Sequence, residues 1–259
     1  MEFILFKFKR CKMATKNINY FDKSFNINYE IINNDKENVI VFLHGWGSNK
    51  EVMKKAFAKN LKECKHIYID MPGFGKTETE YILTTKDYAN IIQIFLNNVL
   101  LKNQIDTITI AGHSFGGKVA TYLEPRKLVL LSTAGILEPK SFKTIVRIRI
   151  AKILNLFGFS KMTKIFRSKD VENMSQNMYE TFKNVVDEDF SDIFAHYSKD
   201  TLILWGEKDT ATSIESGKKI HQLIENSTFI SYPDKHYFFL NYNTQVSEEL
   251  EYWISGTKA

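Results

Sequence analysis

The stretch "TITIAGHSFGGKVA", residues 107–120, is the part of the sequence from which the fold can be inferred. It starts as a run rich in β-branched residues and then turns abruptly through Gly112 and Gly116, on either side of Ser114. Short β-branched runs that end in glycine are typical of buried strands. We therefore predict a strand that ends here, a helix that begins here, and one serine in the corner between them.

The pentapeptide Gly112-His113-Ser114-Phe115-Gly116 fits the pattern Gly-x-Ser-x-Gly. In a strand–turn–helix context this pattern presents a nucleophilic serine on a strained turn. A side chain at either glycine would clash in so tight a turn, and the following helix directs the positive end of its dipole at the serine. The pentapeptide alone also fits a simple corner with a capping serine, so the rest of the chain has to decide.

The runs around this turn predict an α/β fold. Strands that alternate with helices form a mostly parallel central sheet flanked by helices on both faces, and ligands bind at the carboxyl ends of its strands. Residues 25–33 alternate with period two and predict an antiparallel strand, paired with residues near 18–22, at the edge of the sheet. Besides residues 107–114, the expected buried strands lie at residues 38–45, 66–73, 127–135, 201–209 and 228–236.

The chain divides into three predicted parts. Residues 1–17 form an N-terminal extension, residues 18–135 and 198–259 form the α/β core, and residues 136–197 form an inserted helical cap, because their periodicity is helical and no strand interrupts it. The apolar part of the N-terminus precedes its positive charges, the reverse of a signal peptide, and Met13 is an alternative start to Met1.

Two helix starts carry recognisable signals. Ser48 and Glu51 have the spacing of a capping box, which predicts a helix that begins at Ser48. Thr84 and Asp87 have the same spacing and predict the start of a second helix.

Two further residues make the serine a candidate nucleophile. Asp209 and His236 each follow a predicted strand, so the chain has the order serine, aspartate, histidine. A serine hydroxyl needs a base to take its proton, and the base needs an acid to orient it. Glu207 is a weaker candidate for the acid, since it would point the other way at the end of its strand.

A loop after the strand near 38–45 supplies a candidate oxyanion hole. The turn His44-Gly45-Trp46-Gly47 can direct the backbone N–H of Trp46 at the site, and the N–H of Phe115 is the second donor. We expect His44 to brace this loop rather than to act in the chemistry. Loss of one such donor typically costs about 10²–10³ in rate.

Five motifs together resemble the alpha/beta hydrolase superfamily, in its branch with a helical cap: "HGWGS", "DMPGFGKT", "GHSFGGK", "WGEKD" and the late His236. The resemblance covers roughly residues 25–255. It implies Ser114 as nucleophile, His236 as general base and acid, Asp209 as orienting acid, and Trp46 and Phe115 as oxyanion donors.

The sequence departs from the family pattern at two places. Only "EPR", residues 124–126, separates the helix after the serine turn from the next strand, so that helix is expected to be one to two turns shorter than usual. Lys235 stands where the family frequently has glycine before the last histidine, which predicts a looser His236 loop.

The composition excludes several other classes. With 44% hydrophobic residues and a net charge of +5, the chain is an ordinary globular protein without a nucleic-acid signature. No apolar run approaches the roughly 18 residues of a membrane span.

No His, Cys, Asp or Glu residues gather at metal-ligand spacing, so we predict no metal and no cofactor. The two cysteines suit a reducing compartment, so a cytoplasmic location is expected.

Residues 139–169 contain nine Lys or Arg and no Asp or Glu. One interpretation is a cap with a solvated basic outer face. The other is attraction of an anionic partner by residues such as Arg147 and Arg149: a carboxylate substrate, an acyl carrier or a membrane surface.

The expected function is a serine hydrolase that cleaves a small to medium carboxylic ester or thioester through an acyl-enzyme. A serine at the turn argues against the aspartate nucleophile of dehalogenases and epoxide hydrolases. The same triad also supports carbon–carbon bond hydrolysis or lyase chemistry on anionic diketo-type substrates. A third alternative is a ligand-binding member of the fold without turnover.

Overall fold

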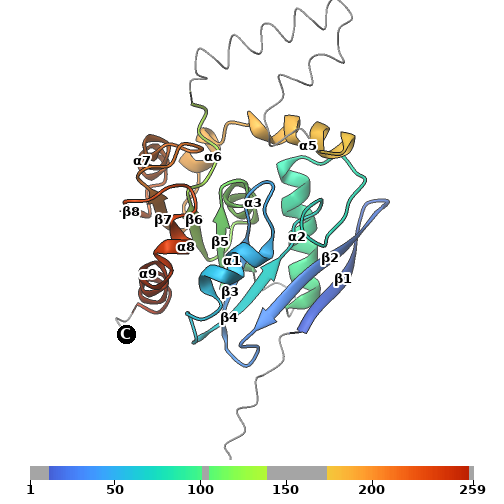
Figure 1. Ribbon diagram of the computed structural model, residues 1–259, viewed down its shortest axis with the longest axis horizontal. Helices are drawn as coiled ribbons and strands as arrows, with labels where there is room; N and C mark the ends of the chain where they lie inside the picture. Colours follow the sequence, from blue (N-terminus) through green and yellow to red (C-terminus); the bar gives the residue numbers. More distant parts are fainter. Residues whose placement is uncertain (1–11, 101–104, 139–173, 257–259) are drawn as a thin grey trace, which may run out of the picture.

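The computed structural model describes residues 12–100, 105–138 and 174–256 of the chain. Its centre is an eight-stranded sheet in the order β1-β2-β4-β3-β5-β6-β7-β8 (Figure 1). The strands from β3 to β8 run parallel to one another, whereas β2 is antiparallel to both of its neighbours, β1 and β4. The strands are β1 Lys12–Tyr20, β2 Lys23–Ile32, β3 Asn38–Leu43, β4 Cys64–Ile69, β5 Thr109–His113, β6 Lys127–Leu131, β7 Asp200–Gly206 and β8 Ser227–Tyr232.

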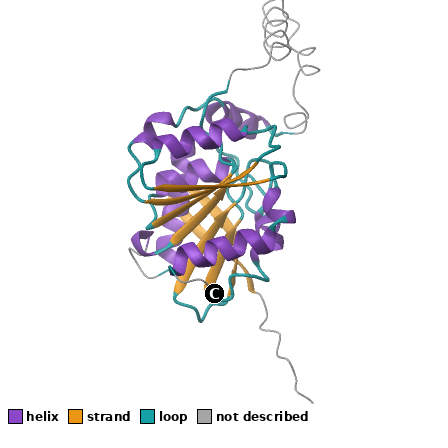
Figure 2. Ribbon diagram, turned by 90° about the vertical axis from the view of Figure 1, so that its left-hand side faces the viewer, coloured by secondary structure: helices purple, strands orange, loops and turns teal. Residues whose placement is uncertain are grey.

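Helices cover both faces of the sheet (Figure 2). One core cluster lies between the sheet and α2, α3, α5, α6 and α7, and a second lies between the sheet and α1, α8 and α9. The helices are α1 Lys50–Phe57, α2 Thr85–Val99, α3 Phe115–Leu123, α5 Gln176–Val186, α6 Ser191–Ala195, α7 Ile214–Leu223, α8 Phe238–Asn241 and α9 Asn243–Ser255, with a 3₁₀ turn at Ile105–Thr107.

The alternation of side chains along the central strands explains this layering. In β3, Val41 and Leu43 enter one core cluster, whereas Ile40 and Phe42 enter the other. A strand that is apolar on both sides needs cover on both faces, which is why its sequence is a continuous apolar run. The predicted α/β class with a mostly parallel sheet is confirmed.

The N-terminal hairpin begins earlier than the boundary we set for the core. β1 starts at Lys12, which pairs with Ile31, so residues 12–17 lie in the sheet rather than in an extension. This part of β1 lacks the apolar alternation of residues 18–22, so the sequence pattern does not identify it as a strand. Backbone pairing with β2 places it in the sheet. β1, and not β2, forms the edge of the sheet.

The two predicted helix starts have different outcomes. Thr84 caps α2 as expected: its hydroxyl accepts from the Asp87 N–H (3.2 Å), and Asp87 Oδ2 accepts from the Thr84 N–H (2.8 Å). The Ser48 capping box is wrong. Asn49 caps α1 instead, with its side chain accepting from the Glu51 N–H at 3.0 Å.

The described part of the inserted segment consists of α5 and α6. Helix α5 is tied to the loop before α2, since Thr181 Oγ1 accepts from the Leu83 N–H (3.1 Å) and the Asn184 amide donates to the Leu83 carbonyl (3.2 Å). The basic stretch at 139–169, with Arg147 and Arg149, lies outside the described residues. The division into a core and a cap stays a prediction. Within the described ranges, no helix combines the length and apolar content of a bilayer span.

Candidate active site

Ser114 occupies a strained turn between β5 and α3. Its backbone has φ 51° and ψ −115°, a conformation that residues with a side chain rarely adopt. The flanking glycines make the turn possible. A Cβ at Gly112 would lie 2.3 Å from the Gly116 carbonyl oxygen, and one at Gly116 would lie 2.5 Å from the Leu43 carbonyl oxygen. The requirement for glycine is therefore a close approach of backbones.

Backbone hydrogen bonds hold this turn against the next strand. The Ser114 N–H donates to the Leu131 carbonyl (3.0 Å), and the Ala134 N–H donates to the Ser114 carbonyl (3.2 Å). Helix α3 has only nine residues and ends at Glu124, which takes the left-handed conformation with φ 47°. The short helix leaves the serine turn intact.

Asp209 and His236 come into direct contact at the carboxyl ends of β7 and β8. The Nδ1–H of His236 donates to Asp209 Oδ2 at 2.6 Å. Three more donors hold the carboxylate: the N–H groups of Ala211 (2.8 Å) and Thr212 (3.1 Å) on Oδ1, and the Thr212 hydroxyl (2.9 Å) on Oδ2. Glu207 turns away and accepts from Ser231 (2.9 Å).

These bonds also set the charge of the carboxylate. Burial alone would raise the pKa of Asp209, but the hydrogen bonds from His236, Thr212 and Ala211 outweigh it and lower the pKa below its ordinary value. The Asp209 side chain has no exposed surface, whereas His236 keeps 18% of its side chain exposed. The pair can therefore hold an ionised carboxylate against an imidazole that still reaches solvent or substrate.

Backbone hydrogen bonds support the loop that carries Lys235 and His236. The Lys235 carbonyl accepts from the Phe238 N–H (2.9 Å), and the Asp234 carbonyl accepts from the Lys208 N–H (2.8 Å). Lys235 is not among the residues with positive φ, so its position does not need glycine. Glycine is therefore not required at this position, and the looser loop stays a prediction.

The two candidate oxyanion donors lie on neighbouring segments. The Trp46 ring packs edge-on against the Phe115 ring at 5.4 Å between centroids, and a Cβ at Gly45 would lie 3.2 Å from Ser114 Cβ. Within the described ranges, neither the Trp46 N–H nor the Phe115 N–H donates a hydrogen bond. Two unused backbone donors beside the serine turn are the feature that an oxyanion hole requires.

Two contacts fix the loop that carries Trp46. His44 Nε2 accepts from the Met71 N–H at 3.1 Å, while its Nδ1 lies 2.8 Å from the Gly45 carbonyl. Lys50 and Asp70, each 1% exposed, form an ion pair of 2.7 Å, and Asp70 also accepts from the Lys50 N–H. The loops after β3 and β4 therefore behave as one unit.

Sequence reasoning missed three supports of the site. The Thr212 hydroxyl donates to Asp209 and also lies 3.1 Å from the Ser132 carbonyl oxygen, the other acceptor within reach of its one hydrogen. Lys50 forms the buried ion pair described above. The ring centroid of Phe182 in α5 lies 5.4 Å from that of Trp46, so the inserted segment contacts the loop that carries Trp46 directly. Among these three residues, only Thr212 has a signal in the sequence, because it follows Asp209 by three positions. The contacts of Lys50 and Phe182 depend on tertiary structure.

One link of the predicted triad is not made in this structure. The Ser114 hydroxyl forms no hydrogen bond with any residue of the described ranges, and only Asp209 and His236 are bonded to each other. Ser114 is nevertheless linked to His236 through the preceding residue, because the ring centroids of His113 and His236 are 4.5 Å apart.

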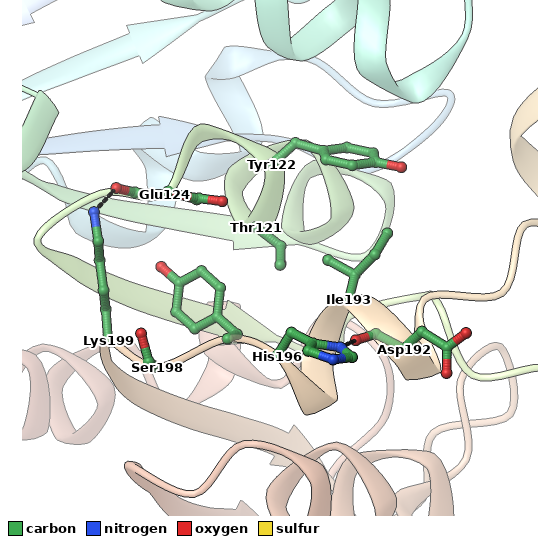
Figure 3. Close-up of a pocket in the computed structure, with 9 residues that line it drawn as sticks. Thr121, Tyr122, Glu124, Asp192, Ile193, His196, Ser198 and Lys199 are labelled. Carbon is green, nitrogen blue, oxygen red and sulfur yellow. Dashed lines mark hydrogen bonds between the residues drawn. The ribbon is translucent and has the colours of Figure 1, made fainter.

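Two cavities are relevant to the position of the site. One of about 460 Å³ borders the site, between Gly135, Leu137 and Val186 on one side and Thr212 on the other. The other, of about 410 Å³, lies between α3 and α6 and contains none of the predicted site residues (Figure 3). Its wall is closed in part by a hydrogen bond from Lys199 to the Glu124 carbonyl.

The remaining histidines have structural or surface positions. His66 is buried and bonded to the Tyr68 hydroxyl and the Leu61 carbonyl, each at 2.8 Å, whereas His196 and His221 are exposed. In the described part of the chain, no three His, Cys, Asp or Glu residues group as metal ligands. The absence of a cofactor stays a prediction.

A sheet of this order, with a serine turn after β5, an aspartate after β7 and a histidine after β8, defines the class of hydrolase-like α/β proteins. The family described as "alpha/beta hydrolase fold" matches residues 38–195, and the chain belongs to it.

The individual relatives have low sequence identity to this chain. The chain is 24% identical over 243 residues to the uncharacterized hydrolase YugF of Bacillus subtilis, covering 80% of this chain and 85% of that one. It is 23% identical over 243 residues to 2-hydroxy-6-oxononadienedioate/2-hydroxy-6-oxononatrienedioate hydrolase 1 of Pseudomonas putida, covering 80% and 83%. Among solved structures, an esterase from Exiguobacterium antarcticum superimposes with a TM-score of 0.71 at 23% identity, covering 94% of this chain and all of that one.

Proposed function

We propose that the protein is a serine hydrolase that cleaves a small to medium carboxylic ester or thioester. The observation that carries this proposal is the 2.6 Å hydrogen bond between His236 and Asp209, beside the strained turn that carries Ser114. Family membership supports the coarser statement that the chain is a hydrolase, and the esterase among the similar structures agrees with it.

The proposed mechanism uses three side chains and two backbone groups. Ser114 attacks the carbonyl carbon while His236 Nε2 takes the hydroxyl proton, and Asp209 stabilises the imidazolium that forms. The N–H groups of Trp46 and Phe115 donate to the oxyanion. His236 then returns the proton to the leaving oxygen or sulfur, which leaves the acyl group on Ser114. In the second half of the reaction His236 takes a proton from water, the water oxygen attacks the acyl carbon, and His236 returns the proton to Ser114 Oγ as the carboxylic acid departs. The contact between serine and histidine forms when substrate binds.

The cavity beside Thr212 supports a substrate of modest size. About 460 Å³ lies within the range of small-molecule sites. Leu137 and Val186 provide exposed apolar surface there, suited to a short acyl or alcohol chain. The described lining also includes three acidic residues, Glu138, Asp187 and Glu188, and no Lys or Arg, although Glu188 is paired with Lys118 behind it. We infer that the described part of this wall favours neutral substrates over anionic ones.

A second candidate function is hydrolysis of a carbon–carbon bond. It is favoured by the likeness to the Pseudomonas putida hydrolase, whose name describes a dienedioate or trienedioate substrate. The same serine and histidine serve that chemistry, but its substrates are anionic, and the carboxylates of the cavity wall count against them. The ester reading is therefore our first choice.

The experiment compares substrates and variants. Wild type is assayed with short p-nitrophenyl esters, the matching thioesters and a vinylogous diketo acid. The variants Ser114→Ala and His236→Ala test the machinery, and Ser231→Ala, which changes a partly buried serine of β8 outside the site, is the matched control.

We expect ester turnover in wild type and Ser231→Ala, and a loss of at least about 10³-fold in Ser114→Ala. Turnover of the diketo acid without ester cleavage would establish the second candidate. Absence of turnover on every substrate, with no labelling by a fluorophosphonate, would favour a ligand-binding protein. A small-molecule substrate is the partner proposed here; the cytoplasmic location stays a prediction.

A further inference from the structure

His113 is a buried group that the proposed mechanism leaves without a role. It is the last residue of β5, precedes Ser114, and is 1% exposed. Its ring packs against the rings of His236, Tyr237 and Phe239, at 4.5, 4.8 and 4.9 Å between centroids. The turn that carries Ser114 and the loop that carries His236 therefore meet at the His113 side chain.

The hydrogen bond of His113 fixes its tautomer. Nε2 lies 3.1 Å from the main-chain carbonyl oxygen of His236. A carbonyl oxygen only accepts, so Nε2 carries the hydrogen and Nδ1 does not. Nδ1 is buried without a hydrogen-bond partner, and a Cβ at Gly45 would lie 2.9 Å from it. A buried acceptor without a hydrogen-bond partner lowers the stability of the folded protein. The contribution of this ring to the site therefore comes from the Nε2–H donor on its other side.

The surroundings keep this ring uncharged. Burial lowers the pKa of His113 well below its ordinary value, and the nearby His236 lowers it further. Asp209 and His44 are the other titratable groups that act on it, with opposite effects. A neutral ring can donate to the His236 carbonyl without placing a second positive charge beside the imidazolium that His236 becomes during turnover.

We propose that His113 is a positioning residue for His236, holding its main chain so that Nδ1 meets Asp209 and Nε2 is left for the serine. The inference rests on the proposed function. Because His113 and Ser114 are joined by one peptide bond, the turn that presents the nucleophile also fixes the base. A displacement of the base by about 1 Å would cost on the order of 10²-fold in rate.

The test uses two variants and one control. His113→Phe keeps a ring and removes the donor, and His113→Gln restores an N–H within reach of the carbonyl. His66→Phe is the matched control, because His66 is also a buried imidazole with two hydrogen bonds but lies away from the site. Thermal unfolding verifies that each variant is folded. Ester kinetics then give kcat and KM separately, and a proton spectrum monitors the low-field resonance of the His236 Nδ1–H on Asp209.

We expect His113→Phe to lower kcat about 10- to 100-fold with KM changed less than about threefold, and His113→Gln to recover part of kcat. The low-field resonance should weaken in His113→Phe and persist in His66→Phe, whose stability falls without loss of kcat. An unchanged resonance in folded His113→Phe would overturn the inference. That readout needs no substrate, so it remains decisive even if ester turnover fails and the proposed function is wrong.

Discussion

At the scale of single residues, the site depends on backbone conformations that ordinary side chains avoid. Ser114 has a positive φ, and the glycines around it permit other backbones to approach within a distance that a Cβ would occupy. Such strain persists only where neighbouring contacts enforce it, here the bonds to Leu131 and Ala134. The strained conformation of Ser114 therefore lowers the stability of the folded protein.

The strain predicts an unusual order of stability among variants. At Ser114, glycine should be more stable than alanine by about 1 kcal/mol, because glycine adopts positive φ without strain. At Ser247, inside α9, the order should reverse by about 1 kcal/mol, because glycine weakens a helix. Urea unfolding of the four variants measures both differences. Equal or lower stability of Ser114→Gly than of Ser114→Ala would show that the turn is not strained.

At the scale of elements, the loops after β3 and β4 together support the proposed oxyanion donor at Trp46. The buried ion pair of Lys50 and Asp70 joins them, together with the bond from Met71 to His44. Phe74 packs edge-on against Trp46 at 4.9 Å between ring centroids, so the second loop also contacts the residue that carries the donor. A change in one loop should therefore affect the position of the other.

Breaking this ion pair should be costly. Asp70→Asn leaves the buried Lys50 charge with only the more distant and exposed carboxylate of Glu51, 3.6 Å away, and we expect a loss of about 3 kcal/mol in the free energy of unfolding. Glu215→Gln, which breaks an exposed pair with Lys218, should cost less than about 1 kcal/mol. Adding Lys50→Met to Asp70→Asn should restore part of the loss. Similar costs for the buried and the exposed pair in urea unfolding would contradict this account.

At the scale of the whole molecule, the fold buries several histidines as neutral groups. His44 is fully buried, and burial lowers its pKa from 6.5 to about 4. Burial lowers the pKa of His66 and of His113 as well. Each of these groups binds a proton more readily in the unfolded chain than in the folded protein.

The stability of the protein should consequently fall in mild acid. As pH drops below about 6.5, the unfolded chain takes up protons that the folded protein excludes, so the free energy of unfolding decreases toward pH 4. The shift at His44 alone corresponds to about 3 kcal/mol at the end of that range. Urea unfolding at pH 7 and at pH 4.5 measures the difference, and His66→Gln should reduce it. Constant stability over this range would show that the histidines are accessible to protons in the folded state.

The sequence was sufficient for features that depend on local patterns. The buried strands, the glycine turn at Ser114 and the Thr84 cap of α2 all leave a signal within a few residues. The order of Ser114, Asp209 and His236 was readable because each follows a predicted strand. Parallel strands end at one edge of the sheet, and that brings such residues together.

Features that depend on contacts between distant segments could not be read in this way. Ser48 and Asn49 are both suitable caps, and the choice between them depends on Lys50, whose N–H is taken by Asp70. The start of β1 depends on pairing with β2, because residues 12–17 carry no apolar alternation. The bond from His113 to the His236 carbonyl joins residues 123 positions apart.

The central claim is that the hydroxyl of Ser114 is a nucleophile activated by His236. The most direct test is to treat the folded protein with a fluorophosphonate and to locate the adduct by mass spectrometry of its peptides. We predict one phosphonylated residue, Ser114, in wild type, and labelling that is strongly slowed in His236→Ala. An adduct on another residue, or a wild-type protein that stays unmodified while folded, would contradict the account.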